Sequence, residues 1–256
     1  MRKKIGLLVL LFCLVIVFLS SGKGEVLAQP LFPIPDLNLQ VGTAEGPEQL
    51  VGTLQLLLLL AVLSLAPAFV ILMTSFTRIV IVLGFVRNAL ATQQIPPNQV
   101  IAGLAIFLTF FVMSPVFSQI NREAVTPYLE EEITFEDALD LGERPIREFM
   151  LNNTREKDLA LFMEMAAVEA PMERQEVSLH LLIPAFILSE LKTAFQMGFI
   201  LFIPFLIIDM VVASILMSMG MFMLPPVIVS LPFKILLFIL VDGWYLVIQS
   251  LVEGFA

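Results

Sequence analysis

The sequence predicts an all-α membrane protein made of kinked hydrophobic helical hairpins, with a small acidic helical insertion on the extracytoplasmic side. Three observations support this fold class. Hydrophobic residues make up 59% of the 256 residues and the mean hydropathy is +0.96, which is too apolar for a soluble domain. Apolar runs long enough to cross a bilayer recur along the chain. The acidic residues, in contrast, are concentrated in one central stretch.

The N-terminus has the pattern of a secretory signal peptide. Three basic residues precede an apolar run that begins at Ile5, and small and polar residues follow it. This pattern predicts a leader over residues 1–28 that is cleaved after Ala28, with an uncleaved anchor helix as the alternative. Cleavage would remove Cys13, the only cysteine in the sequence, so the mature chain would form neither disulfides nor thiolate metal sites.

The next two segments differ sharply in composition. Residues 29–49 contain four prolines and predict an extended N-terminal segment. Residues 50–117 predict a hydrophobic helical hairpin. Its first spanning helix is expected at Leu50–Met73, with a kink at Pro67, and its second at Val100–Phe117.

Residues 118–177 predict a small acidic helical domain. They hold fifteen acidic and six basic side chains, which accounts for the whole net charge of −9. Such a negative patch repels nucleic acid and excludes functions based on binding phosphate. Thr134 and Asp137 have the spacing of a capping box, and Pro145 and Thr154 are expected at the starts of two further helices.

Apolar residues within this domain fall at helical spacings and give each helix one apolar stripe. About sixty residues bury only a marginal core. We therefore expect part of the stripe, with Phe149 and Phe162 foremost, to pack between subunits. The alternative is that both rings belong to the domain's own core.

The leader also predicts the topology. If it places the start of the mature chain outside, the first helix runs inward and the hairpin end carrying Arg78 and Arg87 lies in the cytoplasm, as the positive-inside bias prefers. Parity then puts residues 118–177 in the periplasm. The last two helices run in and return, which leaves the C-terminus outside.

Residues 178–256 predict a second hydrophobic hairpin, which we expect to be the functional centre of the chain. Prolines interrupt it at Pro184, Pro204, Pro225, Pro226 and Pro232. Five ionisable residues lie inside it: Glu190, Lys192, Asp209, Lys234 and Asp242. Charges and broken helices at membrane depth occur where protein or a water-filled passage surrounds them. We therefore expect the hairpin to line an assembly interface or a conduit.

These charges need partners, because an unpaired charge in an apolar medium costs several kcal/mol or is neutralised. Lys234 is expected to pair with Asp209 or Asp242, through a bent helix or a neighbouring subunit. Glu190 and Lys192 are two residues apart on a helix and do not face each other, so their partners are expected elsewhere, on another chain. The alternative for all five is snorkelling or pairing that merely aids assembly.

Catalysis finds little support in the motifs. The single histidine, His180, is expected to be a structural hydrogen-bond donor, and the common hydrolase, metalloprotease and phosphate-loop motifs are missing from the sequence. Folding the last segment about Pro225–Pro226 would bring Asp209 and Asp242 to matching depths, as in an intramembrane aspartyl protease. The glycine context of such a protease is missing, and Lys234 lies two turns from Asp242.

A cluster of methionines precedes the double proline, within the stretch Met219, Gly220, Met221, Phe222 and Met223. Thioether chains are unbranched and adaptable, so several copies around an axis could seal a passage and still deform around unfolded chains. Gly220 allows a non-helical loop. The alternative is ordinary apolar filler at a helix end.

Three blocks of the sequence resemble a known family. They are T-S-F-T-R-I-V-I-V-L-G-F-V-R-N-A-L-A-T-Q-Q-I-P-P-N-Q-V (Thr74–Val100), P-A-F-I-L-S-E-L-K-T-A-F-Q-M-G-F (Pro184–Phe199), and M-G-M-F-M-L-P-P with L-P-F-K-I-L-L-F-I-L-V-D-G-W (Met219–Trp244). All three are similar to the signature blocks of the FliP family, the core subunit of the flagellar type III export gate.

The resemblance implies a pentamer that forms a right-handed helical channel with FliQ and FliR, below which FlhA and FlhB act. It implies passage of unfolded flagellar proteins across the inner membrane at the basal body, with gating, without covalent catalysis and without a cofactor. It also implies that the helices which hydropathy assigns to the membrane are lifted largely out of the bilayer plane on assembly. Met221, Phe222 and Met223 correspond to the methionine-rich loop that constricts the channel, although Phe222 interrupts the methionine run.

Two other functions compete with this interpretation. One is the homologous subunit of a virulence (injectisome) type III secretion system, against which the leader and the long N-terminus favour the flagellar system. The other is a secondary transporter, since broken helices with midplane acids are typical of that class. Transporters often contain internal repeats, and the two halves of this sequence differ in length and in proline placement.

Overall fold

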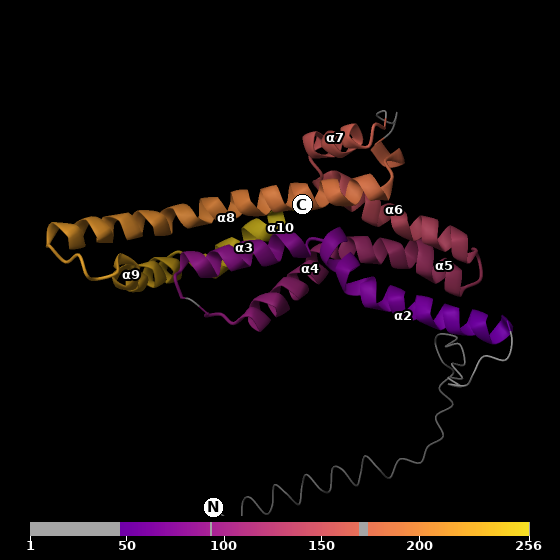
Figure 1. Ribbon diagram of the computed structural model, residues 1–256, viewed down its shortest axis with the longest axis horizontal. Coiled ribbons are helices and arrows are strands. Elements are labelled where there is room, and N and C mark those ends of the chain that lie inside the picture. The colour runs from indigo at the N-terminus through magenta and orange to yellow at the C-terminus, as the bar shows by residue number, and fades with distance from the viewer. Residues whose placement is uncertain (1–46, 93, 169–173, 256) are drawn as a thin grey trace, which may run out of the picture. The chain divides into compact units, whose positions relative to one another are not determined.

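The computed structural model describes residues 47–92, 94–168 and 174–255 (Figure 1). The predicted signal peptide and nearly all of the predicted segment 29–49 lie outside the described residues. Two units make up the chain, residues 1–55 and 56–256. The described part is helical and contains no strand, which confirms the all-α fold class.

The elements follow one another in a simple order. They are α2 (Pro47–Met73), α3 (Phe76–Ala89), α4 (Asn98–Ile120), the π-helical turn η1 (Asn121–Val125), α5 (Thr126–Leu129), α6 (Phe135–Asn153), α7 (Glu156–Met165), the 3-10 turn η2 (Arg174–Glu176), α8 (Leu179–Ser218), α9 (Pro226–Leu240) and α10 (Gly243–Glu253).

Several of these helices are long and apolar enough to cross a membrane. Three described segments qualify: Leu56–Met73, Asn98–Leu129 and Leu179–Ser218. The pair α9 and α10, bent by 63°, makes a fourth if it forms one span. Many of their large apolar side chains are exposed in the single chain, among them Phe107, Phe111 and Phe199. Lipid or other protein chains must cover such surfaces, as expected for a membrane protein.

Helix α3 forms the centre of the first core. Its buried side chains follow the i, i+3, i+4, i+7 spacing of one helix face: Ile79, Val82, Leu83 and Val86. They share a cluster with Ala105 of α4 and Ala194 of α8, both fully buried. At Gly198 of α8 the missing side chain matters, because a Cβ there would overlap the ring of Phe85. Small residues therefore allow α3 and α8 to lie side by side (Figure 1).

The second core joins α6 and α7 to the first half of α8. Met150, Leu182 and Phe186 are its fully buried centre. The capping box is confirmed, because the Thr134 side chain accepts from the Asp137 backbone and the Asp137 carboxylate accepts from the Thr134 backbone. This cap fixes the start of α6.

Two expectations for this region are wrong. Pro145 lies inside α6 rather than in a first turn, and it is buried. The packing of this part of α6 offsets the lost hydrogen bond, which costs roughly 3 kcal/mol in an exposed helix. Thr154 ends α6 and donates its hydroxyl to the Met150 carbonyl at 2.6 Å. Helix α7 then begins at Glu156 without a side-chain cap.

Helix α8 is longer than a membrane span requires. Its 40 residues extend for about 60 Å at 1.5 Å per residue, against about 30 Å for the hydrocarbon core of a bilayer. The break expected at Pro184 and Pro204 is absent, and the helix continues through both. Membrane helices tolerate proline where neighbouring helices and local adjustments satisfy the freed backbone groups. The first half of α8 packs on α3, α6 and α7, and the second half forms a hairpin with α9 (Figure 1).

The sequence suggested that the two arginines of α3 share one end of a hairpin, but the structure separates them. They are nine residues apart, or about 13 Å along the helix. Arg87 donates to the carbonyl of Pro96 and to the side chain of Asn98, in the connection to α4. Arg78 is buried at the other end. Only Arg87 therefore lies at the α3–α4 turn.

Candidate functional site

The loop between α8 and α9, residues 219–225, is here called the methionine loop. Gly220 has φ = 73°, in the left-handed region that glycine adopts without strain, and it ends the long helix. The apolar side chains that follow are exposed: Met219 by 68%, Met221 by 41%, Phe222 by 78% and Met223 by 97%. The structure thus brings the five predicted gate residues together at the tip of the α8–α9 hairpin.

An ion pair lies within the same hairpin. Lys234 Nζ of α9 donates to Asp209 Oδ2 of α8 at 2.6 Å, and the Ser230 hydroxyl donates to the other carboxylate oxygen. Lys234 is only 2% exposed. Of the two expected partners of Lys234, Asp209 and Asp242, the structure shows Asp209, and the pair forms within one chain. A bent helix or a second subunit is not needed for it.

The expected register of the hairpin was wrong. The chain reverses near Met221 and Phe222, whereas the sequence suggested Pro225–Pro226, because Pro226 is already the first residue of α9. This shift moves Lys234 to the level of Asp209. Asp242 instead lies past the end of α9, exposed, with φ = 50° at the bend before α10. Asp209 and Asp242 consequently do not face each other, and the arrangement of an aspartyl protease does not form.

A single arginine joins four segments of the chain. Arg78 Nε donates to Glu190 Oε2 at 2.9 Å, and Nη2 donates to Oε1 of the same carboxylate. Nη1 donates to the Gly254 carbonyl at 2.7 Å, and Nη2 also reaches Asn153 Oδ1 at 3.3 Å. The Phe255 ring lies 3.7 Å from the guanidinium carbon. We call these five residues the Arg78 hub; it ties α3, α6 and α8 to the segment after α10.

The hub corrects one expectation and adds a residue. Glu190 is completely buried, and its partner lies on the same chain rather than on another one. The sequence suggested a cytoplasmic hairpin end for Arg78 and did not reveal this contact, because the two residues are 112 positions apart. The signal that could have found it is an arginine at the start of an apolar helix, which needs a buried anion.

Lys192 also has its partner within the chain. Its Nζ donates to Asp158 of α7, and the hydroxyl of Ser189 donates to the other Asp158 oxygen at 2.9 Å. The backbone N–H of Arg155 donates to the same Ser189 hydroxyl. Burial raises the pKa of Asp158, but the hydrogen bonds from Lys192 and Ser189 and the nearby positive charges outweigh it, so the pKa lies below its ordinary value of 3.8. These contacts among Arg155, Asp158, Ser189 and Lys192, here called the α7–α8 seam, hold α7 against α8.

Acid should weaken the α7–α8 seam. A carboxylate with a lowered pKa in the folded state contributes stability above its unfolded pKa, and this contribution is lost as the pH falls through the folded pKa. Asp158→Asn should therefore cost about 1–2 kcal/mol at neutral pH and remove part of the acid sensitivity below pH 3.8. Thermal unfolding in detergent across this pH range tests it. The exposed Asp140→Asn is the control, and equal effects of both variants would contradict the assignment.

Phe149 and Phe162 both contact the second core. Phe149 lies between Phe186, at 6.0 Å between ring centroids, and Phe255 of the Arg78 hub, at 6.1 Å. Phe162 is partly buried against the same core. Both rings keep exposed surface, so their expected role between subunits stays a prediction.

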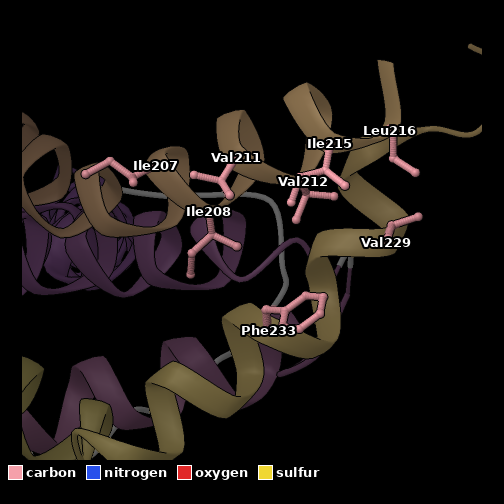
Figure 2. A pocket seen from close by; sticks show the side chains of 8 residues that line it. All are labelled: Ile207, Ile208, Val211, Val212, Ile215, Leu216, Val229 and Phe233. Carbon is pink, nitrogen blue, oxygen red and sulfur yellow. The ribbon is translucent and has the colours of Figure 1, made fainter. Parts of the chain in front are cut away.

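A cleft separates α8 from α9 close to the methionine loop (Figure 2). Its volume is about 450 Å³. Eight apolar side chains line it: Ile207, Ile208, Val211, Val212, Ile215, Leu216, Val229 and Phe233. Without a polar lining side chain the cleft offers an apolar surface and no reacting group.

No cluster of three or more histidine, cysteine, aspartate or glutamate side chains suited to metal binding occurs in residues 47–92, 94–168 and 174–255. His180 is exposed, and its Nε2 lies 3.4 Å from the Ser178 hydroxyl. The polar groups of the site therefore form ion pairs between helices.

Comparison with known proteins identifies the family. The FliP family model matches residues 59–251. Three relatives carry the name flagellar biosynthetic protein FliP. The Bacillus subtilis protein is 60% identical, over 85% of this chain and 98% of its own length. The Pectobacterium carotovorum protein is 55% identical, over 79% of each chain. The Aquifex aeolicus protein is 49% identical, over 94% of this chain and 98% of its own.

The matched region includes all of the ion pairs and the methionine loop described above. It also contains all or most of each long apolar helix, as expected for a multi-pass membrane protein. The chain therefore belongs to the FliP family, and it is a flagellar biosynthetic export protein of the inner membrane that works in a membrane-associated assembly and not as an enzyme.

Proposed function

We propose that this protein forms part of the channel through which unfolded flagellar proteins cross the inner membrane, and that the methionine loop is its gate. The observation that carries the proposal is the exposure of Met219, Met221, Phe222 and Met223 at the tip of the α8–α9 hairpin. Adjacent apolar side chains are left uncovered there by their own chain, at a turn rather than on a membrane-facing helix.

Gating needs no covalent step. Thioether chains and one aromatic ring, repeated around an axis, exclude water and ions as a hydrophobic constriction does. The same flexible chains can yield to an extended polypeptide of any sequence. The Lys234–Asp209 pair sets the register of the two helices that carry the loop. It thereby sets the position of the loop along the hairpin.

The proposed assembly is a pentamer with FliQ and FliR at the flagellar basal body, with FlhB and FlhA below it. The exposed apolar surfaces of α4, α8 and α9 would be covered by other subunits. The length of α8 supports helices lifted out of the bilayer, because much of its first half, including Glu190, is covered by protein. We assign the signal peptide to residues 1–28 and the periplasmic acidic domain to residues 118–177.

The buried charges would serve assembly by shaping each subunit, and Phe149 and Phe162 would complete the contact between neighbours. Replacing both rings by glutamate should prevent oligomer formation, because a charge in an apolar contact is strongly unfavourable. Native mass of the detergent-extracted complex measures this. An unchanged oligomer would rule out the contact.

Chemical blocking tests the gate. Phe222→Cys, in a background with Cys13→Ser, places the only thiol of the chain in the methionine loop. A bulky membrane-impermeant thiol reagent should then stop motility and export of flagellar subunits. Met165→Cys, at an exposed site on α7, is the matched control and should be modified without effect. Confirmed modification of Phe222→Cys with normal export would contradict a gate at this loop.

The curated relatives named above are all flagellar, which favours the flagellar over the virulence system.

A further inference from the structure

Methionines alternate along the end of the α8–α9 hairpin, at Met217, Met219, Met221 and Met223. All four are exposed, and Met223 almost completely so. Two other methionines, Met113 of α4 and Met150 of α6, are fully buried. Two-electron oxidants convert a thioether to a sulfoxide, and they must reach the sulfur to do so. The chain therefore offers such an oxidant one dense, accessible group of thioethers, with buried thioethers elsewhere for comparison.

We infer that the methionine loop is a site of reversible oxidation by peroxide-class oxidants, and that its oxidation opens the gate to ions. The first part depends only on the accessibility of Met219, Met221 and Met223. The second part rests on the proposed function of the loop.

The reaction balances without a further reagent. A sulfur lone pair of the methionine attacks one oxygen of hydrogen peroxide and the O–O bond breaks. The second oxygen takes up the proton of the attacked oxygen and leaves as water, and the attacked oxygen stays on sulfur as the sulfoxide. The sulfur is oxidised by two electrons and the peroxide is reduced by two. Methionine sulfoxide reductases reverse the modification, so the change can act as a switch rather than only as damage.

The consequence follows from the chemistry of the product. A sulfoxide is polar and accepts hydrogen bonds, whereas the thioether is apolar and flexible. A constriction that excludes water through apolar side chains becomes wettable when those side chains become polar. Phe222 does not undergo this reaction, so one apolar ring per subunit would remain among the oxidised methionines.

Mass mapping tests the site. The purified complex in detergent is treated with hydrogen peroxide, and the added oxygen on each methionine is measured over time. Met219 and Met223 should be oxidised about tenfold faster than Met113 and Met150. Met165, exposed on α7, is the accessible reference outside the loop. If the loop methionines react no faster than the buried ones, the inference is overturned.

Ion conductance tests the consequence. Cells carry the wild-type chain, a variant with Met219, Met221 and Met223 all replaced by leucine, or Met165→Leu, and each is compared with its own untreated state. The wild type and Met165→Leu should gain conductance after peroxide and lose it after methionine sulfoxide reductase acts. The leucine variant should not respond.

A loop of glycines separates the two ideas. If glycine replacements at Met221, Phe222 and Met223 leak while the oxidised wild type stays tight, the gate stands and the switch is refuted. If the glycine variant does not leak, the gate itself is refuted, and the mass map alone decides whether the loop is a modification site.

Discussion

Replacing Arg78 by methionine should destabilise the protein by about 3–5 kcal/mol, as expected when one partner of a buried ion pair is removed. The variant leaves the completely buried carboxylate of Glu190 without a counter-charge. It also removes the hydrogen bonds to Asn153 and Gly254 and the contact with the Phe255 ring. Thermal or denaturant unfolding of the detergent-solubilised protein measures the change.

Two further variants make this prediction specific. Arg122→Met removes an exposed arginine whose pair with Glu123 lies on the surface, and it should change stability by less than about 0.5 kcal/mol. The double variant Arg78→Met with Glu190→Met should recover much of the loss, because apolar side chains of similar size can replace a buried ion pair. If Arg78→Met costs no more than Arg122→Met, the hub does not hold these segments together.

The Arg78 hub also shows which contacts the sequence could not predict. The sequence required a partner for Glu190, because a buried carboxylate needs one. Helix periodicity correctly excluded Lys192, two residues away. Periodicity could not distinguish Arg78 from a residue of another chain, because no local sequence signal predicts the contact between α3 and α8. Only the packing of α3 along α8, made close by small residues such as Gly198, brings the two charges together.

The hairpin illustrates a smaller error with the same origin. The sequence limited the partners of Lys234 to Asp209 and Asp242 but left open whether the pair forms within the hairpin or with a neighbouring subunit; the structure pairs it with Asp209 of the same chain. The expected depth of Lys234 relative to these two carboxylates was wrong, because the double proline does not form the turn of the hairpin. A proline favours the first turn of a helix, and Pro226 begins α9 while Gly220 ends α8. Local signals therefore fixed the helix ends better than a symmetric count of residues did.

The acidic domain also shows one local feature that was predicted correctly and two helix boundaries that were not. The capping box at Thr134 and Asp137 needs only neighbouring residues, and it was predicted correctly. Pro145 and Thr154 were assigned to helix starts, although burial of α6 in the second core carries that helix through to Asn153. Tertiary packing overrode propensity there, and propensity alone could not anticipate it.

Glycine at Met221, Phe222 and Met223 should have the largest effect on function. The three side chains are exposed at the tip of the hairpin, outside both cores, so their removal should leave the subunit fold intact. In the proposed channel, however, it deletes most of the apolar constriction from every copy at once. Ion conductance of the inner membrane should then rise about tenfold or more, because a channel without its apolar constriction remains filled with water.

The most direct test of the gate is that conductance measurement, made together with motility, in cells whose only copy carries the three glycines. Native mass of the extracted complex confirms that the assembly still forms, and glycine at Met165 is the control at an exposed site outside the loop. We predict a leaky membrane with altered export for the loop variant and a tight membrane for the control. A tight membrane in the loop variant, with normal assembly, would show that the methionine loop does not close the channel.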